Sequence, residues 1–145
     1  MRELVIGYWR KRNKFHFVPF SIGVVYLWFG ALKFFSGLSP AEELAKSTID
    51  KLTLGLLPSE FSIVLLAFWE TLIGVLLIAN ILEKPALKMA LVHITLTFSP
   101  FLFFSEALFA EAPFALTLLG QYIIKNVIIL GVLLVLLRES KKRQF

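Results

Sequence analysis

Hydrophobic residues are gathered into four long runs along this 145-residue chain, and short polar segments separate the runs. Each run is close to the roughly twenty residues that an α-helix needs to cross a bilayer. The runs cover residues 17–36, 61–82, 86–105 and 114–137. We therefore predict an all-α integral membrane protein, with four transmembrane helices bundled in a single domain.

The segment between the first two runs predicts a short amphipathic surface helix. Ser39, Pro40 and Glu42 match an N-cap, a helix-start proline and a capping box. Apolar residues then recur at helical spacing from Leu44 to Leu52, with charged residues between them. Such a helix either covers the outer mouth of the bundle or only fills the loop.

Two further features are expected in the second half of the chain. Ser99-Pro100 should kink the third helix or end its regular part, because proline cannot donate a backbone hydrogen bond. Residues 106–111 are expected to form a second short surface helix.

Charged residues outside the runs predict the orientation in the membrane. Basic residues dominate both tails and the turn between the second and third runs, whereas acidic residues dominate the other two loops. The basic tail residues are Arg2, Arg10, Lys11, Arg12 and Lys14 before the first run, and Arg138, Lys141, Lys142 and Arg143 after the last. The positive-inside rule then predicts that both termini are cytoplasmic, which agrees with an even number of crossings. We interpret the first run as a retained signal-anchor helix in a prokaryotic plasma membrane.

Composition narrows the function classes. With 58% hydrophobic and 17% charged residues, and a mean hydropathy of +0.81, the chain leaves little for a separate soluble domain. The net charge of +5 lies beside the membrane segments, so both basic termini are expected to contact anionic lipid headgroups rather than nucleic acid. Because there is no cysteine, disulfides, thiolate-bound iron–sulfur clusters and thiol chemistry are excluded.

Glycines on the first run predict a helix-packing surface. Gly23, Gly30 and Gly37 follow one another at helical spacing, and Tyr26 and Lys33 lie on the same face. Small residues let neighbouring helices approach closely.

Each run also contains one ionisable residue. These are Lys33, Glu70, His93 and Lys125. A charge in the hydrocarbon core is costly, so such residues usually face the bundle interior and find partners there. Lys33, near the end of its run, either snorkels to the interface or joins such a site. Glu70 is either one half of a structural ion pair or a proton carrier or ligand-binding group.

The fourth run carries the most specific pattern. Thr117, Gln121 and Lys125 are spaced by four residues, and Asn126 adds an amide beside them. Lys125 is about twelve residues from either end of the run, too deep to snorkel easily. We predict that Lys125 faces the bundle interior.

His93 shares a helix face with Thr97. A bis-histidine haem would need a second membrane-embedded histidine, and His16 lies in the basic tail. One histidine and one carboxylate also support no metal site. A hydrogen-bonding or proton-transfer role for His93 stays open.

The charges within the runs do not balance. Two lysines oppose one glutamate, which leaves one positive charge if both lysines are protonated. Either one lysine is neutral, since burial disfavours its charged form, or an electron-rich group binds there. The candidates are a lipid headgroup, a quinone carbonyl and a small anionic substrate.

Four segments resemble sequence motifs of the DoxX-like membrane proteins, one from each helix of that family. They are residues 26–34 (YLWFGALKF), 70–74 (ETLIG), 97–100 (TFSP) and 120–126 (GQYIIKN). The resemblance spans the first run to the fourth and implies a four-helix membrane bundle with a loose redox association. Asn126 stands where many relatives have an aspartate.

The first functional hypothesis is therefore a quinone-associated or non-catalytic subunit of a membrane redox complex, which is not an enzyme on its own. The second is a purely structural subunit of a larger membrane complex. The third is a small-molecule transporter, for which four helices leave little room. Other membrane subunits or further copies of the chain are the expected protein partners, and quinone or lipid is the possible cofactor.

Overall fold

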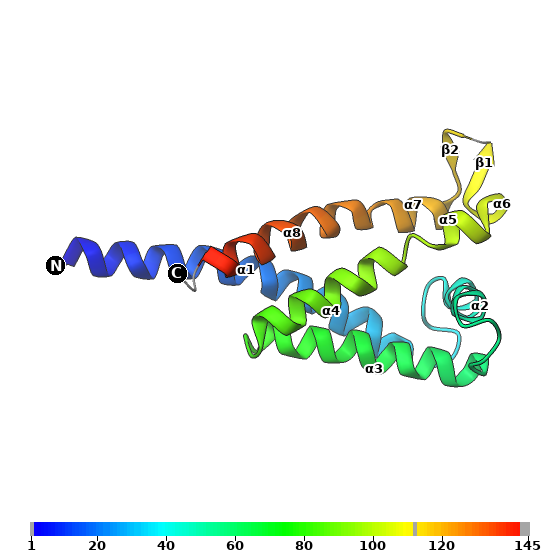
Figure 1. The fold of residues 1–145 in the computed structure, drawn as a ribbon, viewed down its shortest axis with the longest axis horizontal. Coiled ribbons are helices and arrows are strands. Elements are labelled where there is room, and N and C mark those ends of the chain that lie inside the picture. The colour runs from blue at the N-terminus through cyan, green and yellow to red at the C-terminus, as the bar shows by residue number, and fades with distance from the viewer. Residues whose placement is uncertain (1, 112, 143–145) are drawn as a thin grey trace.

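The computed structural model describes residues 2–111 and 113–142, with side chains described for residues 17–111 and 113–140. The elements in chain order are α1 (Arg2–Leu32), α2 (Glu42–Leu52), α3 (Ser59–Ile78), α4 (Glu83–Leu96), α5 (Pro100–Phe103), α6 (Ser105–Leu108), β1 (Phe109–Glu111), β2 (Ala115–Leu116), α7 (Leu118–Ile124) and α8 (Asn126–Lys142). The long helices form an elongated bundle (Figure 1). The beginning of α1 and the end of α8 lie at one end, and α2, α5, α6 and the strands lie at the other.

Three helical stretches in the described part of the chain are long and apolar enough to cross a membrane. They are Ser59–Ile78, Glu83–Phe103 and Leu118–Ser140, with mean hydropathies of 2.3, 1.5 and 2.0. The apolar part of α1, Phe17–Leu32, is shorter, although α1 itself continues back to Arg2. These three spans indicate a membrane protein.

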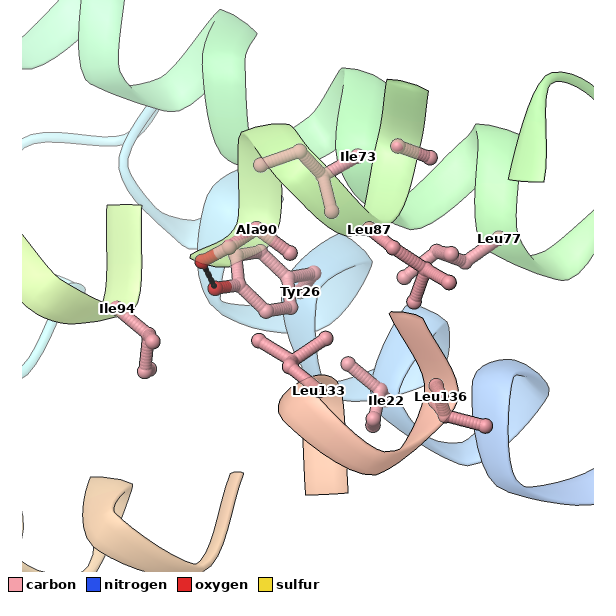
Figure 2. Close-up of a cluster of buried hydrophobic side chains, with 10 residues drawn as sticks. Ile22, Tyr26, Ile73, Leu77, Leu87, Ala90, Ile94, Leu133 and Leu136 are labelled. Carbon is pink, nitrogen blue, oxygen red and sulfur yellow. Dashed lines mark hydrogen bonds between the residues drawn. The ribbon is translucent and has the colours of Figure 1, made fainter. Parts of the chain in front are cut away.

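Packing is organised around one apolar core. α1 packs along α3, α3 contacts α4, and α4 contacts α8. Figure 2 shows the core side chains converging from these four helices. The labelled members are Ile22, Tyr26, Ile73, Leu77, Leu87, Ala90, Ile94, Leu133 and Leu136. Because lipid tails are as apolar as leucine, helices in a bilayer associate through close packing and hydrogen bonds rather than through the hydrophobic effect.

Glycine permits the close approach of α1 and α3. A Cβ atom on Gly74 would lie 2.5 Å from the backbone nitrogen of Leu27, and one on Gly30 would lie 2.7 Å from the backbone of α3. Gly23 also faces α3, with Gly74 O 3.0 Å from where its Cβ would be. The packing expected of Gly23 and Gly30 is therefore present. For Gly37 the expectation is wrong, because it lies in the turn after α1 at φ +79° with no atom within 4 Å of such a Cβ.

The helix expected between the first two runs is α2, but its beginning differs from the prediction. The residue before the helix is Ala41, at φ 59°, and no side chain caps the helix. The capping box does not form because Glu42 Oε2 instead accepts the backbone N–H of Gly37, at 2.8 Å. The Ser39 hydroxyl donates to the carbonyl of Pro40.

Proline explains two helix boundaries. α4 ends at Leu96 and α5 begins with Pro100, which confirms the interruption predicted at Ser99-Pro100. α4 begins at Glu83, three residues before the predicted start, because Pro85 is tolerated in a first helical turn, where N–H groups have no intrahelical partner.

The second short helix, expected over residues 106–111, is present only as the single turn α6, and residues 109–111 form a strand instead. α6 ends at Leu108, and β1 pairs antiparallel with β2 in a small hairpin, the exception to the all-α prediction. The last helical stretch begins at Leu118 rather than at Phe114. Thr117 sets this boundary, because its N–H donates to Leu108 O at 2.9 Å and its hydroxyl accepts the N–H of Gly120 at 3.2 Å.

Candidate functional site

A cavity of about 550 Å³ lies among α1, α2, α3, α4, α7 and α8. α3 and α4 diverge toward the end of the molecule at which α2 lies (Figure 1). Most of the lining is apolar, and α2 contributes Leu44, Ala45 and Ile49 to it. Polar side chains line part of the wall. They are Tyr26, Lys33, Thr48, Thr53, Ser62, Glu70, His93, Thr97, Tyr122 and Asn126. Sites for small molecules commonly have this composition, an apolar wall with a few convergent polar groups.

Lys33 and Glu70 form a buried ion pair at the cavity. Lys33 Nζ lies 2.7 Å from Glu70 Oε2, and the two side chains are only 8% and 7% exposed. Lys33 Nζ also donates to the carbonyl of Phe29, at 3.3 Å. Lys33 follows directly after α1 and therefore points into the bundle instead of extending to solvent. Removing either partner would leave an uncompensated buried charge.

His93 extends the ion pair into a chain of hydrogen bonds. Its Nε2 lies 3.0 Å from Glu70 Oε1, and its Nδ1 lies 3.1 Å from the Tyr26 hydroxyl. The same hydroxyl lies 3.2 Å from the carbonyl oxygen of Ala90, the contact drawn in Figure 2. Tyr26 also packs edge-on against the imidazole, with ring centroids 5.3 Å apart. Both oxygens of Glu70 and both nitrogens of His93 therefore have partners.

This chain accommodates two protonation states of His93. Neutral imidazole with its hydrogen on Nε2 donates to Glu70 and accepts from the Tyr26 hydroxyl. Imidazolium donates through both nitrogens, and the single Tyr26 hydrogen then turns to the carbonyl of Ala90. Since both acceptors lie within hydrogen-bond distance, only a hydroxyl rotation separates the two states. The hydrogen bonding of His93 is therefore complete in either state.

Thr97 and Asn126 form a second polar contact, which links α4 to α8. Asn126 Nδ2 donates to Thr97 Oγ1 at 3.1 Å, and Thr97 Oγ1 donates to the carbonyl of Ile94 at 2.7 Å. Both residues line the cavity, as do Lys33, Glu70 and His93. Five of the seven site residues predicted from the sequence therefore meet in one place.

Gln121 and Lys125 do not join this site. Both are exposed on the outside of the bundle, so the prediction that Lys125 faces the interior is wrong. The inward face of this stretch carries Gly120, Ile123 and Asn126. Gln121 and Lys125 each lie two residues from Ile123, about 200° around the helix, and therefore face the opposite side. The amide of Gln121 donates instead to the carbonyl of Leu116, at 3.3 Å.

Tyr122 is a cavity residue that the sequence patterns did not single out. Its ring packs edge-on against Phe29, with centroids 6.0 Å apart, and it lines the cavity. Within residues 17–111 and 113–140, no hydrogen-bond partner of its hydroxyl is found. Its spacing of four residues from Asn126, on one helix face, is the signal that could have identified it.

With His93 neutral, the polar cluster has no surplus charge. Lys33 and Glu70 cancel, and Lys125, the second lysine of the sequence argument, lies outside the cavity. The positive charge expected to attract an anion is therefore not in the site. Among the described residues, no group of three or more His, Asp or Glu could hold a metal ion.

Outside the spans, Lys46 connects α2 to α3. Lys46 Nζ lies 3.0 Å from Glu42 Oε1 and 3.1 Å from Glu60 Oε1, the latter at the start of α3. Hydrogen bonds to Glu42 and Glu60 raise the pKa of Lys46 above its ordinary value. The Gly37 N–H, followed by Lys46, lowers the pKa of Glu42, because both donate to its charged form.

Comparison of the chain with protein-family models, with curated proteins and with solved structures gives no match. The DoxX-like resemblance therefore stays a prediction from the motifs. The basic tail side chains Arg2–Lys14 and Lys141–Arg143, with His16, lie outside the described side chains, and so do the lipid contacts expected of them.

Proposed function

We propose that this chain is a DoxX-like multi-pass membrane protein that binds a quinone-class molecule as a non-catalytic subunit of a membrane redox complex. The observation that carries the proposal is the cavity, whose apolar wall faces the Lys33–Glu70–His93 chain. A quinone has the matching form, an apolar body with a polar head. The chain has no cysteine, and its described residues include no cluster of metal ligands, so electrons would come from a partner subunit.

The topology proposed with this function has four crossings and both termini in the cytoplasm. α1 supplies the fourth crossing, because its apolar part is continuous with a helix that reaches back to Arg2. The beginning of α1 and the end of α8 lie at the same end of the molecule, which supports a common side for the two basic tails (Figure 1). α2 would then lie at the outer surface, above the cavity.

Quinone binding can be tested with the tryptophans already in the chain. Trp69 lines the cavity, whereas Trp28 is 67% exposed and does not line it. A Trp69-only protein (W9F and W28F) and a Trp28-only control (W9F and W69F) are placed in lipid nanodiscs and titrated with a benzoquinone that carries a ten-carbon tail. Quinones quench indole fluorescence on contact.

Saturable quenching of Trp69 is expected, with only gradual, non-saturating quenching of Trp28 by quinone dissolved in the lipid. Equal, non-saturating curves for the two proteins would refute quinone binding. Copurification of an oxidoreductase with the tagged chain from native membranes is the companion measurement for the redox partner.

A structural subunit without a ligand is the second candidate, and the completed hydrogen bonding of Glu70 and His93 favours it. A satisfied buried polar cluster can serve only to fix how helices pair. Under this alternative, exchanging outward-facing residues such as Ile128 and Leu134 for alanine would release partner proteins. The quinone titration would then give no saturation at Trp69.

A further inference from the structure

The polar groups of the cavity differ in whether they can still form a hydrogen bond to a ligand. Glu70 and His93 are fully engaged with each other, with Lys33 and with Tyr26. Thr97 both accepts from Asn126 and donates to a backbone carbonyl. The cluster on α1, α3 and α4 is therefore largely closed to a ligand, apart from the third hydrogen of the Lys33 ammonium.

Two other residues that line the cavity retain free hydrogen-bonding capacity. The Tyr122 hydroxyl has no partner among the described residues, and Asn126 uses only one of its amide hydrogens, for Thr97. Both belong to the α7–α8 stretch and lie four residues apart on its inward side, where the helix tightens at Lys125. A ligand would meet a hydroxyl donor and an amide donor together there.

Charge restricts what such a ligand can be. With Lys33 and Glu70 neutralising each other, an anionic head would enter a low-dielectric cavity without a counter-charge unless His93 first took up a proton. An uncharged head carrying a carbonyl oxygen has no such cost, and it accepts hydrogen bonds from Tyr122 and Asn126. The apolar side chains of α2 and α3, among them Leu44, Ile49 and Leu66, suit the rest of the molecule.

We propose that Tyr122 and Asn126 bind the head of the ligand, and that this head is an uncharged carbonyl group rather than a carboxylate or phosphate. The inference rests on the proposed function, because it concerns the same cavity. It goes further by assigning recognition to α7 and α8, and by excluding anionic lipids and fatty acids as the preferred occupants.

The test uses the Trp69-only protein in nanodiscs and two probes with equal tails, the ten-carbon benzoquinone and decanoate at pH 7. Because decanoate does not quench indole, it is measured by its displacement of the quinone. The variants are Y122F, which removes only the hydroxyl and keeps the ring against Phe29, and N126L, which removes the amide. The matched control is Q121L, since Gln121 lies on the same helix but faces outward. Size-exclusion profiles check the folding of each variant.

Y122F and N126L should each raise the dissociation constant for the quinone roughly three- to tenfold, the effect of one lost hydrogen bond, while Q121L leaves it unchanged. Decanoate should compete weakly at best. Unchanged quinone binding in both Y122F and N126L would overturn the assignment of the head, and stronger binding of decanoate would overturn the neutral-ligand inference. If the parent protein shows no saturable quinone binding, by contrast, the proposed function itself is refuted.

Discussion

Glu70 is the residue on which the polar cluster depends, because each of its carboxylate oxygens has a different partner. One oxygen pairs with Lys33 on α1's side and the other with His93 on α4. Three chain segments are therefore tied together at a single side chain. In a protein interior, the attraction within an ion pair offsets the desolvation of both charges only while the pair is intact.

E70Q should lower the free energy of unfolding by about 3–5 kcal/mol, because it leaves the Lys33 ammonium buried without a counter-charge. The measurement is a mixed-detergent unfolding titration. K33M/E70Q should recover most of the loss, since the unpaired charge is gone and the oxygen of the introduced amide still accepts from His93. E43Q is the matched control, because Glu43 is 89% exposed, and its effect should stay within about 0.5 kcal/mol. An E70Q effect as small as that of E43Q would contradict the claim that the polar cluster depends on Glu70.

Most of this site could be predicted from the sequence, because a buried charge is costly. The same reasoning explains where the prediction was wrong. Ionisable residues in apolar segments are costly, so Lys33, Glu70 and His93 stand out and do meet. Lys125 stood out equally, but the cost of burying a charge does not say which way a residue points. The packed face of its helix carries Gly120 and Ile123, and Lys125 lies on the other side. Tyr122 was missed because a tyrosine in an aromatic-rich chain carries no such cost.

At the scale of elements, α2 is attached to the rest of the bundle by charges as well as by apolar contacts. Its existence was predictable from its amphipathic spacing, whereas its start was not. The start depends on Glu42 turning back to the Gly37 N–H, a contact that competes with the capping box. The hairpin after α6 could not be predicted from the sequence pattern either, because it depends on the hydrogen bond from Thr117 to Leu108 across the turn.

The attachment of α2 should depend on pH. The lowered pKa of Glu42 means that its contribution exists above the ordinary glutamate pKa and is lost as the pH falls through the lower, folded value. The raised pKa of Lys46 means that its contribution is complete below the ordinary lysine pKa and is lost only as the pH rises through a still higher value. α2 is therefore held from weakly acid to mildly alkaline pH and loosens in strong acid.

A spin label at S47C, on the exposed side of α2, can report this attachment. Label mobility should be low at pH 7 in the parent chain and rise in acid. K46Q should show high mobility already at pH 7. K51Q, which changes an exposed lysine of the same helix, should behave like the parent. Identical mobility of K46Q and the parent at neutral pH would argue against the Lys46 contacts.

At the scale of the whole molecule, the beginning of α1 and the end of α8 lie at one end of the bundle and α2 lies at the other (Figure 1). We expect the membrane to separate these two ends. Since the chain contains no cysteine, single cysteines can be labelled without background. In intact cells, a membrane-impermeant maleimide should label S47C but not Q144C, and lysis should expose Q144C. Labelling of both in intact cells would exclude the proposed orientation.

The Tyr26 hydroxyl gives the buried cluster two hydrogen-bonded states that differ by one proton and one bond rotation. No helix has to move when the cluster passes between them. If the proposed quinone gains negative charge on reduction, a proton placed on His93 would compensate that charge, because both imidazole nitrogens would still have acceptors. A membrane subunit built in this way would lower the electrostatic barrier to electron transfer without carrying electrons itself.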